Sequence, residues 1–421
     1  MSKWQKVKLG KLYEVHNGLS KGREFFGSGY PFLTFSTVFN NWFLPKELDS
    51  LVQSSDKERE ACSIRKGDVF ITRTSETMNE LGMSSVALRD YPKATYNGFT
   101  KRLRPITDTV VPEYIGYYLR SPKFRGKFMA FSTMTTRASL ANGDLLGMEV
   151  ELPTKETQKR IAQILFRYDS LIENYQKQIM LLEEATQRLY KEWFVDLNFP
   201  GHESSKVVDG VPDGWVKRKL WEIADVIMGQ SPKSEFYNSE KEGLPFHQGV
   251  GSYGFRFVVD NVYSTSFTRI AEPNSILFSV RAPVGRLNIT KNKVVIGRGL
   301  AAMNHKNGYQ SFLYYLLKER FFKDNIIGNG AIFASISKDE LLNLEFEIPK
   351  DDLVCKYDII AHKIDNDIKN LDSQIQNLTE ARDRLLPKLM SGEISVETAQ
   401  SVTSGLGVRK EQTVSPQATD S

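Results

Sequence analysis

The side chains of this chain that could do chemistry are mostly basic and amide groups, set among aromatic and hydroxyl residues in short segments. The stretch from Asn97 to Arg104 places Lys101, Arg102 and Arg104 within four positions, on alternating sides if the chain is extended. Arginine can donate two hydrogen bonds to O6 and N7 of guanine, glutamine and asparagine can pair in the same way with adenine, and lysine or serine binds phosphate. Taken together such clusters favour contact with nucleic acid, although any one of these side chains alone is more often a solvated surface charge.

Candidate DNA contacts occur in both halves of the chain, and each set combines cations with amide or hydroxyl groups. In the first half they are Lys21, Arg23, Arg73, Thr74, Ser75, Asn97, Thr100, Lys101, Arg102, Arg104, Arg137 and Ser139. In the second half they are Gln230, Ser231, Lys233, His247, Gln248, Arg281, Arg286, Arg298 and Ser335.

The sequence shows no convincing catalytic motif. The segment Gly249–Gly254 has the spacing G-x-G-x-x-G, but the strand-like Phe255–Val259 follows it where a nucleotide site needs a helix. The sequence contains no phosphate loop and no Asn-Pro-Pro-aromatic or Asp-Pro-Pro-aromatic tetrapeptide of the kind that holds a flipped adenine. The five histidines are scattered, and Cys62 and Cys355 lie in separate halves, so neither a metal site nor a disulfide is expected. We therefore predict no catalytic site and no bound cofactor or metal.

The segments that are expected to position these side chains occur twice in the sequence. Trp4–Val15 returns as Trp215–Val226, and the stretch from Ala138 to Pro153 returns as Ala334 to Pro349. Two copies of one unit imply pseudo-two-fold symmetry, so the natural partner is itself two-fold or bipartite. DNA fits that description.

Each copy has the pattern of a mixed α+β domain. In the first copy the β-branched and aromatic runs predict strands at 30–35, 67–72 and 85–88, and Pro112 opens a short helix that reaches Leu119. In the second copy the corresponding strand is expected at 274–280 and the helix at 312–316.

A heptad pattern follows each domain and predicts a long helix. With Ile161 as position a, the apolar seam of the two copies comprises Ile161, Ile164, Tyr168, Leu171, Tyr175, Gln178, Leu182, Leu189, Tyr357, Ile360, Ile364, Leu371, Gln374, Leu378 and Leu385. A helix of about 35 residues is about 50 Å long, too long to be supported by one small domain, so we expect the two helices to pair antiparallel. Gln178 and Gln374 occupy equivalent d positions, where they either fix the register or are partly exposed without such a role.

The resulting fold class is α+β: two similar mixed α/β domains joined by two long helices that form an antiparallel coiled coil. The expected boundaries are 1–155 for the first domain, 156–198 for the first helix, 199–213 for a linker, 214–350 for the second domain, 351–394 for the second helix and 395–421 for a disordered tail.

Charge and hydropathy agree with this organisation. The chain of 421 residues carries a net charge of +5, and the domains are basic whereas the helices are acidic. Such a split favours a polyanion for the domains and another protein for the helices. The sequence contains no apolar run that could span a bilayer and no apolar core of a signal peptide, so a cytoplasmic location is expected.

Several segments resemble the specificity subunit of type I restriction-modification systems. They are the paired tryptophan-led starts, 66–75, 278–285, Leu152-Pro153 with 161–165, and the closing 389–394, and the likeness covers nearly the whole chain to about residue 394. One departure is 351–356, which lacks the usual Gln-Lys/Arg-Ile-Ala run at the start of the second helix.

The resemblance implies a DNA-binding subunit without catalysis of its own. Each domain is a target-recognition domain that reads half of a split, asymmetric site on double-stranded DNA, and the helices act as a ruler between the halves. Two methyltransferase subunits dock on the helices and bring S-adenosylmethionine and the adenine-methylating site. Motor-nuclease restriction subunits join and use ATP and Mg²⁺.

Two other interpretations stay open at this point. The chain could be an enzyme, a fused nuclease or methyltransferase, which activity of the chain alone would reveal. It could also be a stand-alone coiled-coil scaffold or repressor that binds DNA tightly without partners, and co-purification separates that case.

Overall fold

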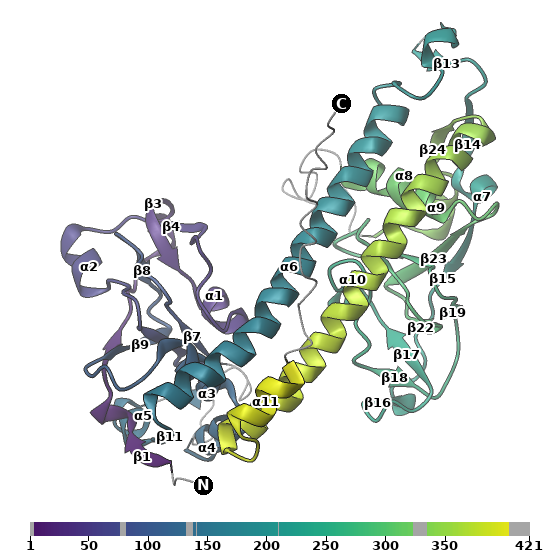
Figure 1. The fold of residues 1–421 in the computed structure, drawn as a ribbon. Coiled ribbons are helices and arrows are strands. Elements are labelled where there is room, and N and C mark those ends of the chain that lie inside the picture. Colours follow the sequence, from purple (N-terminus) through teal and green to yellow (C-terminus); the bar gives the residue numbers. More distant parts are fainter. Residues whose placement is uncertain are drawn as a thin grey trace, which may run out of the picture. The chain divides into compact units, whose positions relative to one another are not determined.

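The computed structural model describes residues 4–75, 81–131, 138–139, 141–208, 210–322 and 335–403 (Figure 1). Contacts divide the chain into two units, one of Met1–Asn174 with Gln374–Ser421 and one of Tyr175–Ser373. Each unit contains one α+β domain, the first half of the long helix that follows this domain, and the second half of the other long helix.

Domain 1 is built on a four-stranded sheet of order β2-β9-β5-β7 and a three-stranded sheet of order β4-β3-β8. Its strands are β1 (Gln5–Lys8), β2 (Tyr13–Asn17), β3 (Phe26–Leu33), β4 (Ser50–Val52), β5 (Val69–Thr72), β6 (Thr74–Ser75), β7 (Ser84–Val86), β8 (Thr95–Tyr96), β9 (Thr100–Pro105), β10 (Ala138–Ser139) and β11 (Glu149–Leu152). Its helices are α1 (Phe35–Asn40), α2 (Asp56–Ala61), α3 (Pro112–Arg120), α4 (Pro122–Phe131) and α5 (Asn142–Gly147).

Domain 2 repeats this plan with a four-stranded sheet of order β15-β23-β20-β21 and a five-stranded sheet of order β16-β18-β17-β22-β19. The strands of this half are β12 (Val207–Val208), β13 (Val211–Pro212), β14 (Val216–Lys219), β15 (Ala224–Met228), β16 (Tyr237–Asn238), β17 (Leu244–His247), β18 (Tyr263–Ser264), β19 (Ile270–Ala271), β20 (Ile276–Ser279), β21 (Leu287–Ile289), β22 (Val294–Ile296), β23 (Leu300–His305) and β24 (Glu345–Ile348). Its helices are α7 (Leu220–Ile223), α8 (Gln310–Phe322) and α9 (Lys338–Leu342).

The repeated sequence motifs are the strands that close each domain. In domain 1, β1 pairs antiparallel with β11, and Gln5 lies opposite Leu152. In domain 2, β14 pairs with β24 in the same way, and Val216 lies opposite Ile348. The start and the end of each domain are thus held together just before the long helix begins, which explains why these two motifs recur together.

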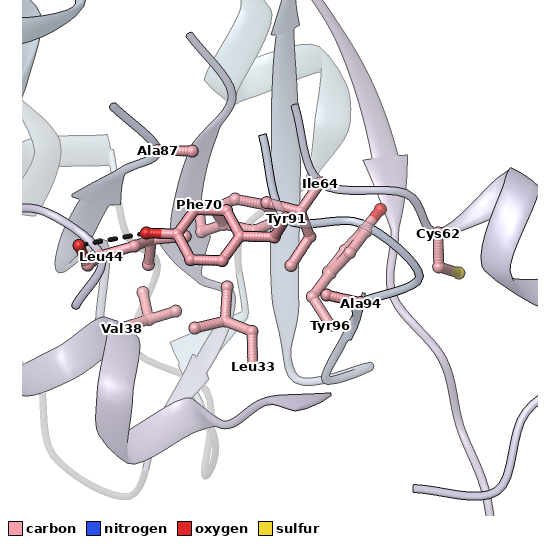
Figure 2. Packing of buried hydrophobic residues seen from close by; sticks show 10 residues of the cluster. All are labelled: Leu33, Val38, Leu44, Cys62, Ile64, Phe70, Ala87, Tyr91, Ala94 and Tyr96. Carbon is pink, nitrogen blue, oxygen red and sulfur yellow. Dashed lines mark hydrogen bonds between the residues drawn. The ribbon is translucent and has the colours of Figure 1, made fainter. Parts of the chain in front are cut away.

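The core of domain 1 is packed from short segments of several strands and loops. Figure 2 shows the side chains that meet there, which are Leu33, Val38, Leu44, Cys62, Ile64, Phe70, Ala87, Tyr91, Ala94 and Tyr96. The hydroxyl of Tyr91 is satisfied inside this core, because it donates to the carbonyl oxygens of Leu44 and Pro45 at 3.2 and 2.7 Å. The strands and helices expected at 30–35, 67–72, 85–88, 112–119, 274–280 and 312–316 are present within a few residues, whereas the strand-like 255–259 forms only isolated bridges.

The long helices are α6 (Lys155–Phe194) and α10 (Asp351–Ser391), and within each unit they pair antiparallel. Thr154 caps the start of α6 by accepting from the backbone N–H of Thr157. In the first unit Asp169 of α6 meets Arg382 of α10 at 2.6 Å. In the second unit the hydroxyl of Tyr357 on α10 donates to the carbonyl oxygen of Thr186 on α6, 3.2 Å away. The predicted helix pairing is confirmed.

The predicted seam is correct in its first row and at Ile164, but most of its second row is wrong by one position. The residues assigned to a, such as Ile161, Tyr168 and Tyr357, are buried as expected. The second row is formed by positions assigned to e, where Leu165 and Ile179 are buried. Seam residues predicted at d include Ile360, Gln178 and Gln374, and all three are exposed. The two glutamines therefore do not lie in the seam, and their alternative interpretation as exposed sites holds.

The start of the predicted tail also differs from the expected one. The sequence placed the start of a disordered tail at residue 395, but Val396–Thr403 forms helix α11. This helix is attached to the first unit, since Glu397 accepts from Arg160 of α6 at 2.7 Å and Gln400 accepts from the same side chain at 3.0 Å. The rest of the predicted tail lies outside the described residues. None of the helices in the described ranges is both long and apolar enough to cross a membrane.

Candidate nucleic-acid interface

In domain 2, the ends of three strands that belong to different parts of the chain meet at one place. The backbone N–H of Gln230, just after β15, donates to the carbonyl oxygen of Ile296 at the end of β22, 2.9 Å away. The N–H of Gly297 donates to the carbonyl oxygen of His247 at the end of β17, 2.8 Å away. A Cβ atom at Gly229 would lie 2.1 Å from the carbonyl oxygen of Gly297, so this approach requires glycine.

Polar side chains from these three strand ends contact one another. The hydroxyl of Ser231 donates to Oε1 of Gln248 at 2.7 Å. The backbone N–H of Arg298 donates to the same serine oxygen at 3.2 Å. Gln230, Gln248 and Arg298 are exposed, so this network faces solvent.

A fourth segment joins the same end of the domain. The N–H of Val280 donates to the carbonyl oxygen of Gly299 at 2.9 Å, and Arg281 forms an antiparallel bridge with Ser335. Arg281 and Ser335 are both exposed. We call the residues gathered here the domain 2 loop cluster, which comprises Gln230, Ser231, Gln248, Arg281, Arg298 and Ser335.

Domain 1 carries an equivalent arrangement. The N–H of Leu19 donates to the carbonyl oxygen of Tyr96 at 2.8 Å, and the N–H of Asn97 donates to that of Leu33 at 2.9 Å. The N–H of Arg73 donates to the carbonyl oxygen of Phe99 at 3.0 Å.

The bridge that follows Arg73 also has its counterpart in domain 1. β6 pairs antiparallel with β10, and Ser139 lies opposite Thr74. We call these residues the domain 1 loop cluster, which comprises Arg73, Thr74, Ser75, Asn97, Phe99 and Ser139. The predicted contacts in separate segments are thus brought together in both domains, whereas Arg137 lies outside the described residues.

Phe99 was not among the predicted contacts. Its side chain is 60 % exposed at the tip of the domain 1 loop cluster, and its backbone N–H donates to Oδ1 of Asn97 at 2.6 Å. The only sequence signal was its place inside a basic segment, since an isolated exposed aromatic residue is common on protein surfaces.

The densest basic segment of the sequence is not an exposed patch, which corrects the prediction for this strand. Lys101 and Arg102 on β9 are buried, at 5 % and 2 % exposure, and Thr100 is also buried. The physical reason is that β9 lies inside the four-stranded sheet, between β2 and β5. The guanidinium of Arg102 donates to the carbonyl oxygen of Ser63 at 2.6 Å and so serves the fold.

Arg104 belongs to the same correction. Its guanidinium contacts the fully buried carboxylate of Asp68 with Nε and Nη2 at 2.9 and 2.7 Å. This hydrogen bonding raises the pKa of Arg104, and the pair is held inside domain 1.

Two further candidates are also engaged in contacts within the protein. His247 is fully buried between the hydroxyl of Ser252 at 2.9 Å and the carboxylate of Asp260 at 3.1 Å, so the prediction that it contacts DNA is wrong. Lys21 donates to the carbonyl oxygen of Gln53 and forms an ion pair with Glu58, each at 2.9 Å. By contrast Arg23 and Lys233 are exposed, and Arg286 is half-buried beside Tyr253 and Lys318.

The sequence matches the family described as the type I restriction modification DNA specificity domain twice, over residues 1–184 and 212–380. The two matched ranges are the two repeats seen in the structure, each with its domain and most of its helix. The chain belongs to this family.

Relatives match this chain over almost its whole length. The chain is 29 % identical to the specificity subunit assigned to the MjaX type I restriction enzyme of Methanocaldococcus jannaschii, with 94 % of each chain covered. It is 28 % identical to the MjaIX specificity subunit of the same organism, again with 94 % of each covered. The crystal structure of a type I restriction-modification S subunit from M. genitalium has a similar fold, with a TM-score of 0.53, 16 % identity and coverage of 92 % of this chain and 96 % of that one.

The prediction of a type I specificity subunit, a DNA-recognition subunit rather than a catalytic one, is therefore confirmed by the family. The described ranges also hold no group of histidine, cysteine, aspartate and glutamate side chains suited to a metal ion.

Contacts that attach each domain of the specificity subunit to the helices were missed by the sequence analysis. In the first unit Tyr117 of α3 donates to Asp169 of α6, which also binds Arg382 of α10. Burial and the neighbouring carboxylate raise the pKa of Tyr117, so its hydroxyl stays protonated and donates.

The second unit has an equivalent cluster of a tyrosine, an aspartate and an arginine, which we call a node as in the first unit. Its arginine comes from a different element. Tyr315 of α8 donates to Asp365 of α10 at 3.4 Å. Arg256, which is 1 % exposed and comes from domain 2, binds Asp365 at 2.7 Å and Glu183 of α6 at 2.9 Å. The two aspartates occupy matching places in the two repeats and could have been found by aligning them, whereas the arginines come from different elements and leave no such signal.

Proposed function

We propose that this specificity subunit reads a split, asymmetric site on double-stranded DNA, one half with each domain. The observation that carries this proposal is the duplication itself: each domain presents a loop cluster held together by equivalent backbone contacts between strand ends. The side chains differ between the clusters, since Gln248 and Arg298 occur in one and Asn97 and Phe99 in the other. Equivalent frames with different polar groups are what two different half-sites require.

The proposal extends to the helices, whose exposed faces would receive two methyltransferase subunits. α6 and α10 keep exposed apolar residues, among them Met180, Leu181, Ile359 and Ile360 with exposed fractions of 52, 61, 54 and 41 %. Exposed apolar side chains on a long helix pair favour another protein as partner. The methyltransferase subunits would bring S-adenosylmethionine, and restriction subunits that use ATP and Mg²⁺ would complete the complex. The helices would set the spacing between the half-sites.

Mapping of methylated adenines tests the proposal. The chain is expressed with the methyltransferase subunit from its own genome in a host without other adenine methylation, and the methylated sites are sequenced. A split motif with a fixed spacer, lost when the chain is omitted, is expected. Tight, specific DNA binding by the chain alone, with no methylation when the partner is present, would instead indicate a stand-alone repressor.

A further inference from the structure

Gln248 in the domain 2 loop cluster is an amide whose two ends have different neighbours. The hydroxyl of Ser231 donates to its Oε1 at 2.7 Å, and the N–H of Arg298 occupies a lone pair of the same hydroxyl at 3.2 Å. One lone pair of the amide oxygen is therefore filled by this donor. The amide nitrogen carries two hydrogens, and among the described residues no hydrogen bond from it is found.

The position of Gln248 is fixed by backbone contacts as well. The N–H of Gly299 donates to its carbonyl oxygen at 3.2 Å. A Cβ atom at Gly297 would lie 2.5 Å from Oε1 of Gln248, so a larger residue there would displace the amide. An exposed side chain whose amide is held by a hydrogen bond, on a backbone that is itself fixed, is suited to recognition, because little rotamer freedom is lost when it binds.

The group next to this amide is also a donor. Arg298 is exposed and lies between Gly297 and Gly299, the two glycines that contact Gln248. A guanidinium has five N–H donors and no acceptor. Gln248 Nε2 and Arg298 together therefore present hydrogen-bond donors to solvent.

The base edges of DNA differ in the partner that they offer to such a pair. In the major groove guanine presents two acceptors, O6 and N7, whereas cytosine presents a donor and adenine one acceptor beside one donor. Thymine presents a single acceptor beside its methyl group, so guanine is the base that offers two acceptors to two donors. We propose that Gln248, positioned by Ser231 and supported by Arg298, reads the acceptor edge of a guanine in the half-site of domain 2. This inference rests on the proposed function, because it requires domain 2 to read a half-site.

Variants of Gln248 test the inference in the assembled complex. Gln248→Met keeps the size of the side chain and removes the donor, and Gln248→Glu replaces the donor by an acceptor. Methylated motifs are sequenced from cells that express each variant with the methyltransferase subunit, and exchange of residues 1–153 shows which half-site belongs to domain 2. We expect a required G·C pair in that half-site in the wild type. At this pair, Gln248→Met should lower discrimination by about 5- to 150-fold, and Gln248→Glu should favour the base that donates, cytosine.

Ser231→Ala and Asn292→Ala complete the design. Ser231→Ala removes the hydroxyl that orients the amide, so discrimination at the same base pair should fall while the rest of the motif is kept. Asn292 is an exposed amide residue at the opposite end of β22, so Asn292→Ala should leave the motif unchanged.

The outcomes separate this inference from the proposed function. A split motif that lacks a G·C pair in the domain 2 half-site, or that is unchanged in both Gln248 variants, overturns the inference and leaves the proposed function standing. The absence of any split motif in the wild type overturns both. If a variant methylates no site, its purified complex is bound to duplexes with each of the four base pairs at that position. Loss confined to the guanine duplex supports the inference, and equal loss on all four overturns it.

Discussion

The ion pair of Arg104 and Asp68 is the residue-scale feature with the clearest consequence for stability. Asp68 is fully buried, and its partner supplies two hydrogen bonds. Arg104→Ala would leave the carboxylate without its guanidinium, so we expect the free energy of unfolding to fall by about 3 kcal/mol. Denaturant unfolding of the full chain measures this change.

The exposed Lys66 on the same domain provides the control for Arg104. Lys66→Ala should change the unfolding free energy by less than about 0.5 kcal/mol. If Arg104→Ala unfolded like the wild type but lowered the salt dependence of DNA binding, the arginine would have to face phosphate after all.

A second residue-scale prediction concerns pH. Burial lowers the pKa of His305 from 6.5 to about 4, and its Nδ1 accepts from the backbone N–H of Asn307 at 3.1 Å. The unfolded chain takes up a proton near pH 6.5, whereas the folded chain resists until about pH 4. Domain 2 should therefore lose stability as the pH falls through this window.

His305→Gln removes the titrating group and tests this origin. Unfolding free energies measured at pH 7 and pH 5 should differ less in this variant than in the wild type. The same pH dependence in both proteins would assign the effect to other groups.

At the element scale, the two nodes that attach the domains to the helices should contribute unequally to the free energy of unfolding. Arg256 neutralises carboxylates on both α6 and α10, whereas Arg382 neutralises Asp169 of α6 and the more exposed Asp383 of its own helix. We expect Arg256→Ala to lower the unfolding free energy by about 3–5 kcal/mol and Arg382→Ala by less.

Hydrogen exchange of residues 351–373 locates the effect of Arg256→Ala. Amides of this segment should exchange faster in the variant, because domain 2 no longer clamps the start of α10. Arg384, exposed by 81 % and paired within its own helix, supplies the control Arg384→Ala, which should be nearly neutral. Unchanged exchange in Arg256→Ala would show that the node does not hold the helix.

The helix pair carries a second element-scale prediction. Insertion of seven residues before Gln178 in α6, matched by seven before Gln374 in α10, preserves the heptad and lengthens each helix by about 10.5 Å. If the helices set the spacer, methylation mapping should show both half-sites retained and a spacer longer by about three base pairs. The single insertion breaks the match between the helices and should be less stable. An active double insertion that keeps the original spacer would contradict the proposal that the helices set the distance between the half-sites.

The register of this helix pair could have been predicted from the sequence. Positions d and e are both apolar at Ile164 and Leu165, so the first turns do not decide between them. Later only e is apolar, as at Ile179 beside Gln178, and this difference identifies the buried row. The burial of Lys101 and Arg102 could not have been predicted from the sequence. It depends on the order of strands in the sheet, and distant segments determine that order.

At the scale of the whole molecule, duplication made most of the architecture predictable. A pair of motifs that recurs in both halves is expected to form the same structure twice, and β1 with β11 and β14 with β24 do so. The grouping of residues in the loop clusters could be predicted in part, because these residues lie at the ends of predicted strands. Which side chains present donors could not be predicted, since the contact of Ser231 with Gln248 joins segments that no local pattern relates.

The most direct test of the account is exchange of one domain. Residues 1–153 end with β11 and the proline before α6, so this segment can be replaced by the first domain of a relative without changing the helices. The chimera is expressed with the methyltransferase subunit, and methylated adenines are mapped across the genome. We expect one half of the motif to change to that of the relative, with the other half and the spacer retained. A motif altered in both halves, or in neither, would contradict the assignment of one domain to each half-site.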